Sequence, residues 1–304
     1  NTAVGYQALT AFTTGHSNTA IGYQAGYSNL VSRHNVYIGY QAGYNQLGTE
    51  SYGDNIFIGY KAGFSTADGG FQRNTIIGTN AGDSNNMALN TIVGWYSGRY
   101  AGSKNVTMGY YAGLGASGGD YSQTVILGVE AGLSNTDKGD LVAIGYQAAR
   151  TGGSKRGVFI GMGAGYSESG ATNYNVSVGF NSGYSNVSSA HIAYLGGFAG
   201  RYATGNENTY IGYSAGHGVN GSSTATQNTA VGKESLYGVT TGNDNSALGY
   251  HSLYSTTTAR YQVAIGFEAL YSNTAGDNGV AIGYQALKNL NQTTNTHVVA
   301  VGSN

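Results

Sequence analysis

The chain repeats one pattern of apolar and polar positions around a glycine, which we call the repeat glycine and number as position 0. The residue at position −1 is Ile, Val, Leu or Met in every repeat, and the residue at position −3 is Thr, Val, Ile, Ala or Ser. Apolar or β-branched residues two apart are typical of a strand whose two side chains share one face. We therefore expect a short strand before each repeat glycine, as at 19–21 and 36–38, with positions −1 and −3 in the core. The eighteen repeat glycines are Gly5, Gly22, Gly39, Gly59, Gly78, Gly94, Gly109, Gly128, Gly145, Gly161, Gly179, Gly196, Gly212, Gly232, Gly249, Gly266, Gly283 and Gly302.

The residue at position −2 lies between these two and points to the opposite face of the strand. A strand face in contact with water should carry polar residues. Position −2 is instead apolar or aromatic from Ala3 to Ala300, with Thr107 and Ser177 as the exceptions. A continuous apolar stripe on an outward face normally marks an interface. We therefore expect partner chains to pack along position −2.

The spacing of the repeats predicts the fold class. Repeat glycines are 15 to 20 residues apart, most often 17, whereas helix pairs and propeller blades need about 30 to 45 residues per repeat. Position +3 is Ala or Ser, small enough for a second backbone layer to pack closely, and the frequent glycines exclude helix. The sequence predicts an all-β, parallel β-solenoid of about 18 coils, each with a short strand, a glycine turn, a second short strand and a looser corner. Coils stacked at about 4.8 Å would form a rod about 85 Å long.

Positions −2 and +4 vary together. Where position −2 is bulky, position +4 is glycine, and where position −2 is Ala, position +4 is usually Leu. Such conservation of volume predicts that the two positions touch, within one chain or across an interface. It divides the single solenoid domain 1–304 into Gly-type coils (18–227) and Leu-type coils (228–304). Two pairs depart from the rule, namely Ala20 with Gly26 and Ala143 with Ala149.

Two further positions repeat often enough to predict ladders of stacked side chains. Position −4 is Asn in eleven repeats, including the first seven, and position +1 is frequently Tyr. Stacked amides hydrogen-bond from coil to coil, and stacked aromatic rings pack in the same way. We interpret both ladders as structural, with sugar binding as the alternative for the tyrosines.

Composition and charge exclude several classes of partner. The chain has 52 Gly, 27 Tyr, no Pro, no Cys and a formal net charge of −1. Without a run of Lys or Arg there is no electrostatic reason to expect nucleic acid or an acidic membrane surface. No stretch approaches 18 apolar residues, so we expect no membrane insertion. Because the chain begins with Asn inside a repeat, we expect it to be a segment of a longer protein.

Candidate chemistry is sparse. The stretch GYSAG (212–216) matches the pattern of a hydrolase nucleophile, yet it is the ordinary repeat with Ser214 in place of Gln. The six histidines stand alone in the sequence, without a recurring acidic or second histidine partner at metal-ligand spacing, and 14 Asp and Glu are too few for a ligand in each coil. We therefore predict no catalytic, cofactor-binding or metal-binding residues, and no enzyme activity.

Where the chain makes specific contacts, we expect the long corners to make them. The corners 44–54, 65–73, 116–123 and 217–227 differ from one another and interrupt the regular spacing. Loops tolerate such variation and often carry function.

The repeats resemble those of two known kinds of fibre protein. The stretches NTAVG, NTAIG, NVYIG, NTIVG and NSALG are similar to the head repeats of trimeric autotransporter adhesins, and the longer NTAIGYQAGYSN is similar to repeats of tail-fibre-type proteins. The resemblance implies a left-handed β-roll, three chains to a fibre, and an extracellular location on a cell or virion. It covers nearly the whole chain but specifies no receptor.

Our leading hypothesis is a structural and adhesive fibre segment, a homotrimer that attaches to a surface glycan or a cell-surface receptor. The alternative is a monomeric solenoid that binds glycan or ice. That alternative needs a flat outward face of regularly spaced Thr or exposed aromatic residues, and Thr is frequent at position −3, which we expect to lie in the core. Light scattering would separate the two hypotheses by mass.

Overall fold

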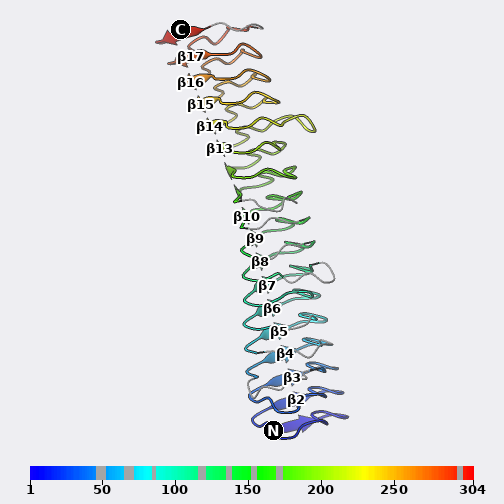
Figure 1. The fold of residues 1–304 in the computed structure, drawn as a ribbon. Coiled ribbons are helices and arrows are strands. Elements are labelled where there is room, and N and C mark those ends of the chain that lie inside the picture. The colour runs from blue at the N-terminus through cyan, green and yellow to red at the C-terminus, as the bar shows by residue number, and fades with distance from the viewer. Residues whose placement is uncertain are drawn as a thin grey trace. The chain divides into compact units, whose positions relative to one another are not determined.

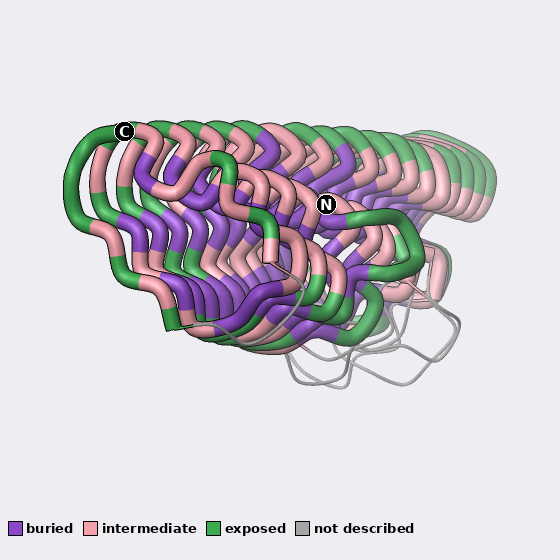
Figure 2. The backbone as a smooth tube through the Cα atoms, turned by 90° about the horizontal axis from the view of Figure 1, so that it is seen from above, coloured by how far each residue is buried: buried purple, intermediate pink, exposed green. Residues whose placement is uncertain are grey.

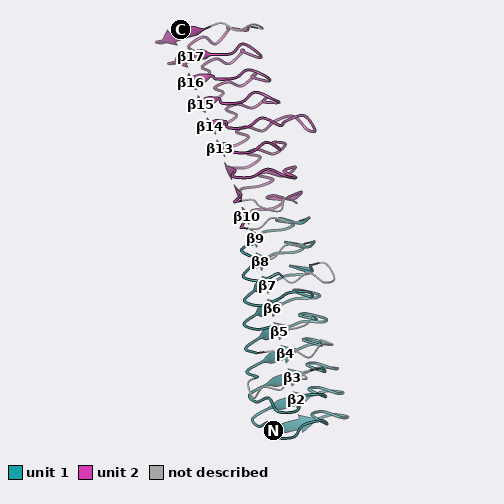
Figure 3. Cartoon of the chain, viewed as in Figure 1, with its two compact units in different colours: residues 1–153 teal, residues 154–304 magenta. Residues whose placement is uncertain are grey.

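The structure is a computed structural model that describes residues 1–45, 53–64, 72–83, 87–115, 121–134, 139–151, 156–168, 174–292 and 297–304. The chain forms two compact units, Asn1–Gly153 and Ser154–Asn304 (Figure 3). Each unit is built from short strands joined by turns and corners, and the described residues include no helix.

A short strand precedes every repeat glycine, as the pattern predicts. In the first unit these are β1 (Thr2–Val4), β2 (Thr19–Ile21), β3 (Val36–Ile38), β4 (Ile56–Ile58), β5 (Thr75–Ile77), β6 (Thr91–Val93), β7 (Val106–Met108), β8 (Val125–Leu127) and β9 (Val142–Ile144). In the second they are β10 (Val158–Ile160), β11 (Val176–Val178), β12 (Ala193–Leu195), β13 (Thr209–Ile211), β14 (Thr229–Val231), β15 (Ser246–Leu248), β16 (Val263–Ile265), β17 (Gly279–Ile282) and β18 (Val298–Val301).

Within each unit, consecutive strands pair in parallel and stack one coil on the next (Figure 1). The register joins equal positions of neighbouring repeats, so that Ala20 lies beside Tyr37 and Tyr37 beside Phe57. The expected parallel β-solenoid is confirmed.

The two faces of the strands are the reverse of our expectation. Position −2 is in the core: Tyr37, Phe57 and Tyr194 are fully buried. Positions −1 and −3 point outward, and Ile21 at position −1 is 42% exposed. Figure 2 shows buried residues along the inside of the coils and exposed residues along the outside. The predicted interface along position −2 is therefore wrong, because each chain covers that position with its own turns.

The segment after each repeat glycine supplies the opposite wall of the core. A methyl group at Gly43 (position +4) would lie 2.5 Å from Tyr37 Cδ1, so the Tyr37 ring occupies the space that a side chain at Gly43 would need. Positions −2 and +4 thus touch within one chain. The Ala or Ser at position +3 is buried in every described repeat except the first, where it is half-buried. This burial agrees with the expectation that a second backbone layer packs closely against position +3.

One departure from the volume rule has a structural explanation. Gly26 shares its coil with the small Ala20, yet a methyl group at Gly26 would lie 2.6 Å from Cδ2 of Tyr37 in the next coil. Tyr37 therefore lies against glycine at position +4 both of its own coil, Gly43, and of the preceding coil, Gly26. Phe57 has the same setting, because it lies against both Gly43 and Gly63.

The segment after the repeat glycine is a run of turns, so the expected second strand is wrong. Residues at positions +2 and +4 have positive φ, as at Gln24 (52°) and Gly26 (62°). The Gln24 N–H donates to the Tyr6 carbonyl of the preceding coil (2.8 Å), and the Gly26 N–H donates to the Ala42 carbonyl of the following coil (2.9 Å). Neighbouring coils are therefore joined by backbone hydrogen bonds in this segment, as they are in the strands. The backbone differs from that of a strand, because φ is positive at every second residue.

The predicted Asn ladder at position −4 is present and buried. In the first unit Asn35 Nδ2 donates to Asn18 Oδ1 (2.9 Å), and Asn55 Nδ2 donates to Asn35 Oδ1 (3.0 Å). Each Oδ1 also accepts the backbone N–H of the Asn in the next coil, as Asn18 Oδ1 does from Asn35 (2.9 Å). The ladder satisfies backbone groups that would otherwise be buried without partners.

We expect Asn245→Ala to lower the free energy of unfolding by about 3 kcal/mol, because it removes several buried hydrogen bonds and leaves their partners unsatisfied. Asn245 Nδ2 donates to Asn228 Oδ1 (3.0 Å) and the Ala259 carbonyl (2.9 Å), and its Oδ1 accepts the Gln262 N–H (3.1 Å). Thermal unfolding followed by circular dichroism measures the loss. The exposed Asn291→Ala is the control, and equal melting of the two variants would contradict a stabilising ladder.

Candidate interaction surface

The outward face of the strands carries two parallel rows of side chains in each unit, one apolar and one mostly β-branched, and we call this face the outer strand face. The first row is position −1, where Leu248 is 49% exposed and Ile265 is 38% exposed. The second row is position −3, mostly Thr or Val. Because strand residues alternate between faces, the buried position −2 forces both rows outward. Exposed members of the first row include Val4, Ile21, Ile77, Met108, Ile160, Leu195, Ile211, Leu248, Ile265, Ile282 and Val301.

The tyrosines at position +1 form the predicted aromatic ladder, beside the outer strand face. The rings of Tyr23 and Tyr40 stack at 5.0 Å between centroids, and those of Tyr40 and Tyr60 at 5.1 Å. All three side chains remain partly exposed, at 41% for Tyr23, 42% for Tyr40 and 46% for Tyr60. Because neighbouring rings cover each other's faces, a sugar could reach only their edges, which favours the structural interpretation of this ladder.

A second aromatic ladder at position +5 escaped the sequence analysis. Tyr27 and Tyr44 stack at 5.0 Å in the first unit, and Tyr254 and Tyr271 stack at 5.0 Å in the second. The signal that could have found it is the Tyr that follows the Gly or Leu at position +4 in these repeats.

Polar side chains at position +2 lie between the two aromatic ladders. Gln24 Nε2 donates to Gln7 Oε1 (2.8 Å), and Gln41 Nε2 donates to Gln24 Oε1 (2.8 Å). The ammonium of Lys61 lies 5.5 Å from the ring centroid of Tyr60 and 4.9 Å from that of Phe64, so it spans both ladders. This side of the coil is therefore a mixed polar and aromatic surface, unlike the outer strand face.

Charged groups on the coils pair with the neighbouring coil. Arg150 Nε lies 2.8 Å from Glu130 Oε2, and this hydrogen bond, with one from Gln147, lowers the pKa of Glu130. The pKa of Glu268 is lowered in the same way, first by Lys288. Such partly exposed pairs contribute little to stability individually.

Two histidines do have acidic partners, contrary to the expectation that all six stand alone. His34 Nδ1 lies 3.1 Å from Asp54 Oδ1, and His251 Nε2 lies 2.6 Å from Glu234 Oε2. Each pair joins neighbouring coils. Among the described residues, no group of three or more His, Cys, Asp and Glu side chains is placed to hold a metal ion.

Ser214 of the GYSAG stretch lies at position +2 in the turn after β13, with φ of 54°. Its side chain is nearly buried, and its N–H donates to the Gly197 carbonyl (2.8 Å). The segment that follows it is another turn and not a helix. In the part of the chain that the structure describes, no helix is long and apolar enough to cross a membrane.

Three of the four long corners that we expect to make specific contacts lie largely outside the described residues, namely 44–54, 65–73 and 116–123. The fourth, 217–227, is described. The Ser223 hydroxyl donates to the Val239 carbonyl (2.7 Å) and accepts the Val219 N–H (2.6 Å), which fixes the loop. His217 at its start stacks on Tyr237 (4.8 Å), and partial burial lowers the pKa of His217.

Comparisons with known proteins return no relative. No protein-family model, no curated protein and no solved structure matches the chain significantly. The function must therefore be argued from the repeat itself and from the surfaces described above.

Proposed function

We propose that this chain is a structural and adhesive fibre segment in which three copies associate along their outer strand faces. The observation that supports this most directly is the row of exposed Ile, Leu, Val and Met at position −1 that each unit carries along its strands. Monomeric proteins rarely leave so long an apolar stripe in water. The fibre would stand on the surface of a cell or virion and attach it to a partner, as the resemblance to adhesin and tail-fibre repeats implies.

The proposal moves the association surface from position −2 to positions −1 and −3. β-Branched and aliphatic residues dominate these rows, and charges are absent from them. Association would cover both rows and the adjacent ring edges at position +1, while the polar side of each coil stays in water. Repeating a weak attachment site along three chains would add avidity to the fibre.

We expect light scattering to give three times the 31.3 kDa of one chain. Replacing three consecutive members of the row, Leu248→Glu, Ile265→Lys and Ile282→Glu, should reduce the mass, because association would then bury charges. The alternating signs keep stacked neighbours within one chain attractive, so the coils should stay folded by circular dichroism.

The control for this experiment is Val219→Glu, an exposed apolar residue in a corner loop, away from the strands. It should leave the mass unchanged. A single-chain mass for the unaltered protein would contradict the fibre proposal, and an undiminished mass for the triple variant would move the interface off the outer strand face.

A monomeric ice-binding solenoid is the second candidate, and one structural observation favours it. The Thr residues at position −3, which the sequence pattern assigned to the core, point outward in pairs on neighbouring strands, as Thr75 and Thr91 do. An outward array of regularly spaced hydroxyl and methyl groups is what this function requires. An ice-binding solenoid predicts that light scattering gives the mass of a single chain and that the protein shows thermal hysteresis of freezing. The absence of either result would exclude this function.

A further inference from the structure

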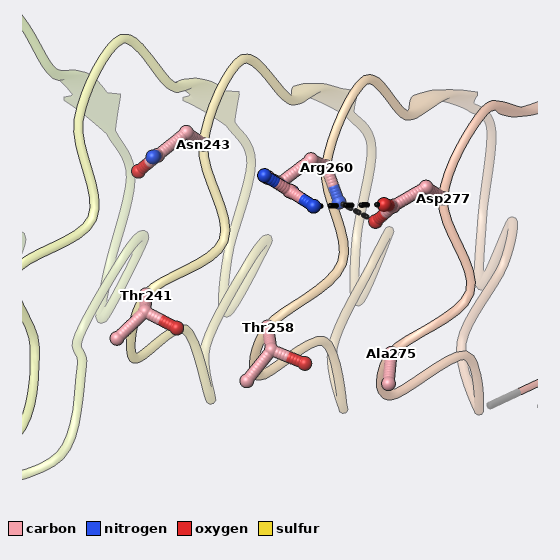
Figure 4. A pocket seen from close by; sticks show the side chains of 6 residues that line it. All are labelled: Thr241, Asn243, Thr258, Arg260, Ala275 and Asp277. Atoms are coloured by element: carbon pink, nitrogen blue, oxygen red, sulfur yellow. Dashed lines mark hydrogen bonds and ion pairs between the residues drawn. The ribbon is translucent and has the colours of Figure 1, made fainter. Parts of the chain in front are cut away.

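A polar groove of about 370 Å³ crosses three coils of the second unit, at the corners that lead into β15, β16 and β17 (Figure 4). One rim consists of Asn243, Arg260 and Asp277, and the other of Thr241, Thr258 and Ala275. Each row takes the same repeat position from three successive coils.

The groove exists because of the local sequence. The repeat glycines from Gly232 to Gly283 are evenly spaced at 17 residues, so these corners have equal length and their side chains align. The residues between the two rims, Gly242, Ala259 and Gly276, are small and buried. They form a floor without projecting side chains.

The groove offers hydrogen-bond donors and acceptors side by side. Asp277, only 8% exposed, accepts the Arg260 N–H through Oδ1 (2.7 Å) and the Arg260 guanidinium Nη2 through Oδ2 (3.4 Å). The hydroxyls of Thr241 and Thr258 and the amide Nδ2 of Asn243 make no hydrogen bond with any described residue. The rims therefore hold unused hydroxyl and amide groups beside one guanidinium–carboxylate pair.

We propose that this groove binds a linear segment of a neutral polysaccharide, with one sugar residue per coil. Neutral sugars present hydroxyls that both donate and accept, which suits an Arg and Asp pair whose charges cancel. An anionic ligand would meet the carboxylate of Asp277, and an apolar ligand would leave the rim groups unpaired. The repeat along the groove is the coil spacing, about 5 Å, which is about the length of a sugar residue in an extended chain.

The inference rests on the proposed adhesive function, for which it names the class of receptor, but it uses different residues. The groove lies before the strands, whereas the proposed association uses the outward strand positions. Variants of one surface therefore leave the other chemically unchanged.

The chain itself supplies a conservative variant of the groove. In the neighbouring coils Thr226 occupies the position of Arg260, and its N–H donates to Asn243 Oδ1 (2.8 Å) as the Arg260 N–H does to Asp277. The double substitution Arg260→Thr with Asp277→Asn recreates that arrangement. It should preserve the corner while removing both charged groups from the groove.

The test is saturation-transfer NMR and titration calorimetry of the 304-residue chain with cellohexaose, chitohexaose and maltohexaose, and with a heparin hexasaccharide as the anionic arm. We expect at least one neutral hexasaccharide to bind, with affinity at least tenfold weaker in the double variant and unchanged in Val219→Glu. Absence of neutral binding at millimolar concentration, binding of the anionic sugar alone, or equal affinity in the double variant would overturn the inference. If the protein is a trimer that binds no sugar, only the inference of a sugar-binding groove is overturned. If it is a monomer that binds sugar through the groove, only the proposal of a trimeric fibre is overturned.

Discussion

Gly232→Ala is expected to destabilise the second unit by about 4 kcal/mol or more, among the largest effects of any single methyl group in this chain. Gly232 has φ of 131°, a conformation that residues with a Cβ rarely adopt. The added Cβ would also lie 2.5 Å from the carbonyl oxygen of Gly249 in the next coil. The two coils are held together by backbone hydrogen bonds, so neither can move aside without breaking several of them.

Gly221→Ala is the matched control. Gly221 also has positive φ (73°), but a methyl group there would meet nothing within 4 Å. We expect a cost of about 1 kcal/mol, that of the backbone conformation alone. Hydrogen exchange should show loss of protection on both sides of Gly232, at β14 and β15, because a solenoid is stabilised by contacts between neighbouring coils. Similar protection in the two variants would show that the close approach of the coils does not require glycine.

The second large effect concerns the paired volumes in the core. Ala264, Leu253 and Leu270 are fully buried in one cluster. Ala264→Phe alone should overpack the core and cost about 1–3 kcal/mol, since the ring would enter the space of both leucines. Leu253→Gly and Leu270→Gly should each cost about 2–5 kcal/mol through the cavity they leave. Leu270 has φ of 50°, so glycine adds no backbone strain there.

The three changes made together recreate the setting of Phe57 between Gly43 and Gly63. We choose Phe because the hydroxyl of Tyr210 in the same cluster has no described hydrogen-bond partner. The triple variant should melt several degrees above the value that the summed single losses give, and the difference measures the coupling. Additive losses would mean that the two packing types, 18–227 and 228–304, are not set by positions −2 and +4.

The Asn and Tyr ladders could be predicted from the repetition of the sequence alone. Once equal positions are known to stack, the Asn at position −4 and the Tyr at position +1 must form rows, and the structure places them so. The groove at Arg260 and Asp277 could not be found in this way. It depends on small residues lying between two rims, which is a property of how the corner bends.

By itself the sequence determined the period, the strand before each repeat glycine, the parallel stacking and the contact between positions −2 and +4. It could not determine which strand face is inside, because the alternation around Ile21 places apolar residues on both faces and a period of two is symmetric between them. The tertiary structure decided this through volume. The coil closes so that Tyr37 and Phe57 fill the space left by Gly43. That closure turns position −1 outward, and so it also fixed the surface available to a partner.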